Sequence, residues 1–75
     1  MDNTPKTNVV ASFADTADAA DAVKELRAAG FAAAKIGVTT QDAGAVVTVH
    51  ADGRHAEAAA TMEGNGAASV QNVAR

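Results

Sequence analysis

Two histidines and an aspartate lie close together in the sequence and are the residues best suited to chemistry. His50, Asp52 and His55 could converge as imidazole and carboxylate ligands, a donor set that divalent metals accept. Their spacing is not that of any strong metal motif, and one carboxylate with two imidazoles leaves an open site. We therefore interpret His50 as a surface residue and His55 as part of a helix cap, and we expect no metal and no other cofactor.

Two aspartates occupy equivalent places after apolar segments and invite comparison with an acid–base pair. Asp15 follows the first such segment and Asp52 the third. Neighbouring antiparallel strands run in opposite directions, so their last residues lie at opposite ends of the sheet. These two carboxylates would therefore not reach one substrate. We interpret each as a helix cap, whose side chain accepts hydrogen bonds from the first backbone N–H groups of a helix.

Two further patterns point away from catalysis. Gly64-Asn65-Gly66 follows a helical segment rather than opening one, so it predicts a helix end and not a phosphate loop. An enzyme of the acylphosphatase type would need an arginine in a glycine-rich loop after the first strand, where this sequence has Ala14-Asp15-Thr16. A carboxylate at that place would repel an anion. We expect a protein that is not an enzyme.

The composition indicates one small domain with a thin core. The chain has 75 residues, no Cys, two Phe and no Trp or Tyr. Disulfides and thiolate-bound zinc are therefore excluded, and tight packing of alanines together with a partner subunit is expected to supplement the core. The net charge is −3 and the basic residues are scattered, which argues against nucleic-acid binding. No apolar run reaches membrane-spanning length and the first residues lack the apolar segment of a leader, so we expect no membrane association and a cytoplasmic location.

The elements that position these residues follow from hydrophobic periodicity. Residues 1–7 are expected to form a flexible lead-in and residues 8–75 a single domain. The expected strands span 8–13, 34–40, 45–51 and 67–73, and the expected helices 15–29 and 52–63. The expected inner faces of the helices carry Ala19, Ala22, Val23 and Leu26 in the first and Ala56, Ala59 and Met62 in the second.

An internal repeat supports this order of elements. The segment 9–15 matches 46–52, and after a gap of one residue Leu26 matches Met62 and Gly30 matches Gly66. Each half is then one strand–helix–strand unit. Right-handed crossovers and a hairpin at 41–44 interleave the two units. The prediction is an α+β, ferredoxin-like βαββαβ sandwich, with a four-stranded antiparallel sheet in the order 4-1-3-2 and two helices on one face.

The same residues resemble a known family. Val9-Val10-x-x-Phe13-x-Asp15, Leu26-x-x-Ala29-Gly30-Phe31 and the segment 45–51 are similar to general stress protein 17M-like (heat-induced stress protein) domains, over about residues 8 to 72. The resemblance implies a bacterial, stress-associated domain, and it brings no catalytic residue with it.

The sheet face that the helices leave open is the expected place of function. Carried across by the repeat, one face receives Val9, Ala11, Phe13, Val46, Thr48 and His50. Apolar residues on both faces of a sheet indicate that both faces are covered. We expect a homodimer or a protein partner to dock here, which makes the chain a non-catalytic stress-associated interaction module.

Two alternatives stay open at this point. In the first, the face assignment is inverted, with Phe13 in the core and a smaller apolar patch exposed. In the second, the function is that of a small-ligand-binding sensor, with its pocket at a dimer interface.

Overall fold

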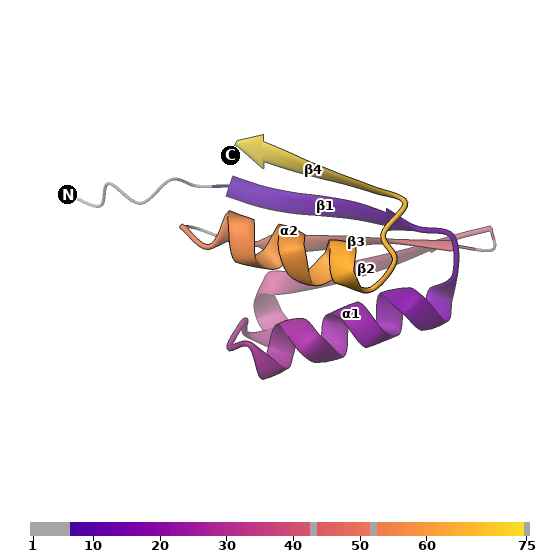
Figure 1. The fold of residues 1–75 in the computed structure, drawn as a ribbon, viewed down its shortest axis with the longest axis horizontal. Coiled ribbons are helices and arrows are strands. Elements are labelled where there is room, and N and C mark those ends of the chain that lie inside the picture. Colours follow the sequence, from indigo (N-terminus) through magenta and orange to yellow (C-terminus); the bar gives the residue numbers. More distant parts are fainter. Residues whose placement is uncertain (1–6, 43, 52, 75) are drawn as a thin grey trace.

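A computed structural model describes residues 7–42, 44–51 and 53–74 of the chain. Two helices and four strands follow one another along it in the predicted order (Figure 1). The elements are β1 (Thr7–Phe13), α1 (Thr16–Ala28), a 3-10 turn (Ala33–Lys35), β2 (Ile36–Gln41), β3 (Gly44–His50), α2 (His55–Gly64) and β4 (Ser69–Ala74). Residues 1–6 of the expected lead-in lie outside the described residues, and Thr7 belongs to β1.

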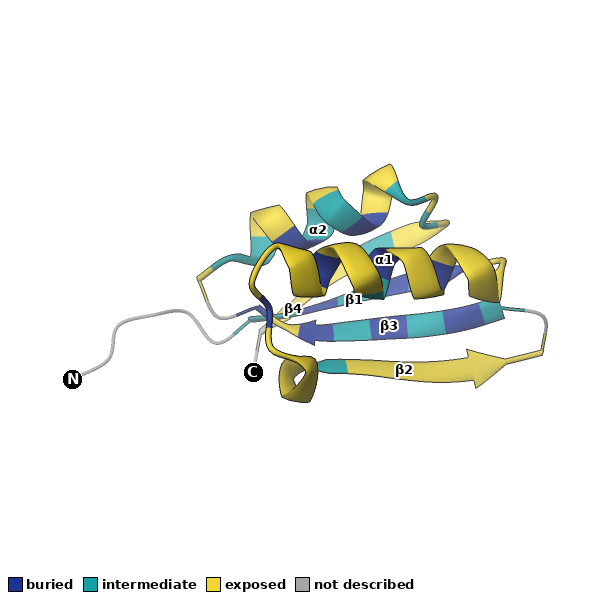
Figure 2. Ribbon diagram, turned by 90° about the horizontal axis from the view of Figure 1, so that it is seen from below, coloured by how far each residue is buried: buried dark blue, intermediate teal, exposed yellow. Residues whose placement is uncertain are grey.

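The four strands form one antiparallel sheet in the order β2-β3-β1-β4. This is the predicted order 4-1-3-2 read from the other edge, so that prediction is confirmed. Both helices lie over the same face of the sheet (Figures 1 and 2). α2 packs on β1 and β4, while α1 packs on β3 and against α2. Neither of the two described helices lies on the other face.

The start and the end of α1 follow from two residues that sequence analysis identified. The side chain of Asp15 accepts a hydrogen bond from the backbone N–H of Ala17 at 2.8 Å, which confirms the predicted cap. Gly30 follows the helix with a φ of 104°, in the left-handed region that glycine enters most easily. The backbone N–H of Phe31 then donates to the carbonyl of Leu26 at 3.1 Å.

α2 ends in the same way as α1 but begins differently. Gly66 has a φ of 91°, and the N–H of Ala67 donates to the carbonyl of Met62 at 3.2 Å, so the predicted equivalence of the helix ends is confirmed. The predicted start of this helix at residue 52 is wrong. Arg54 is the residue before the first turn and makes no side-chain capping hydrogen bond. Asp52 lies outside the described residues.

The inner face of α1 is as predicted and that of α2 is shifted. Ala19, Ala22 and Leu26 are buried, and Val23 packs partly against the core. In α2 Met62 is buried and Ala59 packs partly against the core, as predicted, but Ala56 is exposed and Ala58 is buried in its place. Ala58 and Ala59 lie four and three residues before Met62, which puts them on the same side of the helix.

The core lies between the two helices and the sheet face that they cover. It contains apolar side chains alone among the described residues. Its members are Val9, Ala11, Phe13, Ala19, Ala22, Leu26, Phe31, Ala45, Val47, Val49, Ala51, Ala58 and Met62. Six of the thirteen are alanines, so the helices pack on the sheet largely through small side chains.

Candidate functional site

Half of the predicted interface lies in the core. Val9 and Ala11 are fully buried beneath the helices and Phe13 is 3% exposed. In the pairing of β1 with β3, Val9 lies opposite Val49 and Phe13 opposite Ala45. Directly opposed residues share a face of the sheet. The assignment of Val9, Ala11 and Phe13 to the open face is therefore wrong, and the alternative that places Phe13 in the core is confirmed.

The error has a simple geometric cause. The repeat matches Val9 with Val46, but in β3 the buried residues are the two neighbours of Val46, namely Ala45 and Val47. Side chains alternate between the two faces of a strand, so a slip of one residue moves every side chain to the other face. Val46, Thr48 and His50 do lie on the open face.

The open face, defined by the pairing register, extends across all four strands. Each of its residues stands opposite another member of the face on the neighbouring strand. None of them is buried, and Figure 2 shows the exposed outer strand β2 at its edge. The open face consists of Asn8, Val10, Ser12, Gly37, Thr39, Gln41, Gly44, Val46, Thr48, His50, Ser69, Gln71 and Val73.

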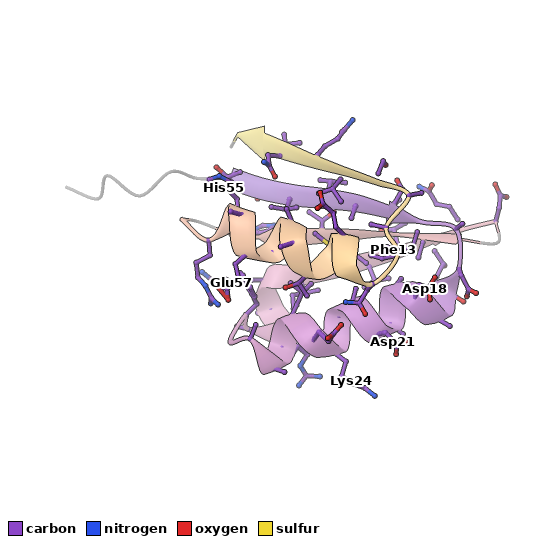
Figure 3. All side chains as sticks on the ribbon, in the orientation of Figure 1. Phe13, Asp18, Asp21, Lys24, His55 and Glu57 are labelled. Carbon is purple, nitrogen blue, oxygen red and sulfur yellow. The ribbon has the colours of Figure 1, made fainter. Side chains whose placement is uncertain are left out.

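The open face contains no Asp, Glu, Lys or Arg. Within the described ranges, all such residues lie on the helices, in the 3-10 turn, in the β2–β3 turn or at a helix cap. Figure 3 labels Asp18, Asp21 and Lys24 on α1 and Glu57 on α2, all in the helical layer. The described charged residues therefore all lie outside the open face.

The apolar part of the open face is a diagonal of three valines. Val10 of β1 is opposite Thr48 in β3 and opposite Gln71 in β4. Val46 and Val73 each lie two residues from those partners on the same face, so they are the diagonal neighbours of Val10. Val73 is 45% exposed. The three valines therefore form a diagonal across the strands β3, β1 and β4.

The two histidines lie at opposite ends of one connection. His50 ends β3 on the open face, opposite Asn8, and His55 is the first residue of α2 (Figure 3). The Nδ1 atom of His55 is buried and has no hydrogen-bond partner in the described structure. Among residues 7–42, 44–51 and 53–74, no group of three or more His, Cys, Asp or Glu could hold a metal ion. Asp52, the third member of the predicted set, is outside those residues.

A second polar centre was missed by sequence analysis. The guanidinium of Arg54 lies 4.1 Å from the ring centroid of Phe31 and donates from Nη2 to the carbonyl of Ala29 at 2.8 Å. Its Nε donates to Glu57 at 3.3 Å, and the two residues form an ion pair. Arg54 therefore joins the start of α2 to the end of α1. No local pattern marks this contact, because the partners from α1 are distant in sequence.

Comparisons with known proteins found no relative of this chain. No protein-family model, no curated protein and no solved structure matches the chain. The resemblance to general stress protein 17M-like domains thus stays a prediction. No helix in the described part of the chain has the length and apolar character needed to cross a membrane.

Proposed function

We propose that the chain is a non-catalytic interaction module that forms a homodimer through the open face of its sheet. The observation that carries this proposal is the absence of charged side chains from that whole face. The surface of a soluble monomer normally mixes both signs of charge, whereas the centre of a protein–protein interface is depleted of charge. The open face thus has the composition of an interface.

A second copy of the chain is the partner that this face fits best. Each copy carries a net charge of −3, which would oppose association if acidic groups met at the contact. The described charges lie instead in the helical layer, in the 3-10 turn or in the β2–β3 turn, so two open faces can approach without an unpaired ion being buried. A two-fold dimer brings the same patch of both subunits together, and in this arrangement the valine diagonal meets its own copy.

The size of the open face limits the affinity. Four strands spaced about 4.8 Å apart and about six residues long cover roughly 400 Å² per subunit. A standard interface buries about 800 Å² per partner. We therefore expect a weak dimer, with a dissociation constant of about 10 to 100 μM.

The proposal also includes a ferredoxin-like fold and a role in the bacterial stress response. The order of elements, the sheet order and the two helices on one side support a ferredoxin-like βαββαβ sandwich. Sheets of this architecture leave one face free for docking. We place the module in the stress response of a bacterial cytoplasm on the basis of the sequence resemblance alone, and an induced rise of the protein under heat would support it.

Valine methyl groups provide a direct test because valines line both faces of the sheet. In a dilution series followed by methyl NMR, the proposal predicts concentration-dependent shifts for Val10, Val46 and Val73. The buried Val9 and Val47 serve as internal controls and should not shift. Unchanged spectra from about 5 μM to about 500 μM, a range that brackets the expected affinity, would rule out self-association. Shifts confined to the helical side would place the contact elsewhere and contradict the proposal.

A further inference from the structure

A hollow of about 170 Å³ lies where the end of α1, the end of β3 and the start of α2 meet. Its basic residues come from three different elements, and no carboxylate lines it among the described residues. The lining consists of Gly30, Phe31, Ala32, Lys35, His50, Ala51 and Arg54. In a chain with a net charge of −3, this is a local concentration of basic groups.

Arg54 is held in a fixed orientation at this hollow. Three groups constrain its guanidinium: the Phe31 ring, the carbonyl of Ala29 and the carboxylate of Glu57. Phe31 is itself 6% exposed, so the ring offers a rigid support for the cation. A long side chain that is fixed in this way has already lost the freedom that ligand binding would otherwise restrict.

The contacts of Arg54 leave one of its nitrogens available. Nε and Nη2 donate to Glu57 and Ala29, whereas Nη1 makes no hydrogen bond with the described part of the chain. Nη1 is directed toward Gly30, because a Cβ added at that glycine would lie 3.6 Å from it. Gly30 lines the hollow. Two N–H donors of a guanidinium are thus presented at its wall.

We propose that this hollow binds a small oxyanion, with Arg54 donating from Nη1 and Lys35 supplying a second positive charge. Carboxylate and phosphate oxygens are the acceptors that guanidinium groups bind most strongly. A hollow of about 170 Å³ has room for an anion the size of phosphate or a short carboxylate. Glu57 neutralises part of the charge of Arg54, so we expect binding in the range of about 1 mM.

A backbone NMR titration of the full chain tests the site. Sodium phosphate and sodium acetate are the two probes, each compared with sodium chloride at matched ionic strength. The site predicts saturable shifts at the amides of Gly30, Ala32 and Arg54 with at least one oxyanion. Saturation with phosphate alone or with acetate alone identifies the preferred class. Shifts that do not saturate, or that chloride reproduces, would overturn the proposal. None of these three amides lies on the open face.

A pair of lysine variants separates the site from general charge effects. Lys35→Gln removes the exposed cation that lines the hollow, and the dissociation constant should rise about fivefold for the lost contact in a water-exposed site. Lys24→Gln removes the same charge from α1, away from the lining, and should leave the constant unchanged. Equal effects of the two substitutions would show that only net charge matters and would contradict the proposed site.

Discussion

The two faces of the sheet are built from alternate residues of the same strands, yet their chemistry differs completely. Beneath the helices, Val9, Val47 and Val49 are fully buried in a core without a polar member among the described residues. On the open side, Val46 and Thr48 are half-buried beside polar uncharged neighbours. One face therefore holds the fold together, and the other is free to meet a partner.

This comparison separates two uses of the same residue type. Val46 and Val47 are adjacent in β3, but only Val47 loses all contact with water in the folded chain. Complete burial of a valine side chain contributes about 1.5 kcal/mol or more to folding, and a side chain left half in water contributes less. A substitution at Val47 should therefore affect the free energy of unfolding, and the same substitution at Val46 should affect association.

The largest expected effect comes from a charge placed in the core. Val47→Asp buries a carboxylate without a partner, at a cost of several kcal/mol. The total stability of a chain of this length is on the order of 4 to 11 kcal/mol. We expect the variant to be largely unfolded, as circular dichroism would show by a loss of helical signal. A variant that keeps the wild-type spectrum and unfolding midpoint would mean that Val47 does not face the core.

A smaller but still large effect is expected at Phe13. Phe13→Ala leaves a cavity under the helices and should lower the free energy of unfolding by about 3 kcal/mol or more. Urea denaturation measures the loss. Val46→Ala, on the opposite face, is the control and should change the same quantity by about 0.5 kcal/mol at most. Equal losses for the two variants would contradict the assignment of Phe13 to the buried face.

The helix that covers the buried face supplies a third, modest effect. Asp15→Ala removes the side-chain acceptor from the first turn of α1 and should cost about 1 kcal/mol of stability. Asp18→Ala removes an acidic residue from the same turn and is expected to cost a few tenths of that, about 0.3 kcal/mol, through the helix dipole. Urea denaturation of both variants measures the two losses in the free energy of unfolding, and the loss should be larger for Asp15→Ala. No difference would mean that the hydrogen bond to Ala17 contributes nothing.

Much of the fold follows from local sequence signals. The glycines after each helix and the cap at Asp15 act through nearest neighbours, so the sequence predicts them correctly. The face of β1 could also have been predicted, because Asn8 and Ser12 alternate with apolar residues. It was missed because the repeat was read one residue out of register, and period-two alternation turns such a slip into the wrong face.

The start of α2 and the basic hollow could not be predicted in this way. Arg54 occupies the cap position without a capping side-chain hydrogen bond, so it lacks the usual signature of a helix start. Its contacts with Ala29 and Phe31 join residues brought together only by the tertiary fold. Lys35 reaches the same hollow from the 3-10 turn, which replaces the first residues of the strand predicted at 34–40.

The most direct test of the account is the molecular mass in solution. Sedimentation equilibrium at about 200 μM, above the whole expected range of dissociation constants, should give a mass well above that of the monomer for the wild type. Val46→Asp places a charge at the open face and should give a monomer with the wild-type circular dichroism spectrum. Val38→Asp places the same charge at an exposed valine on the helical side of β2 and should still dimerise. A wild type that stays monomeric at this concentration, or a Val46→Asp variant that dimerises as the wild type does, would contradict the proposed interface.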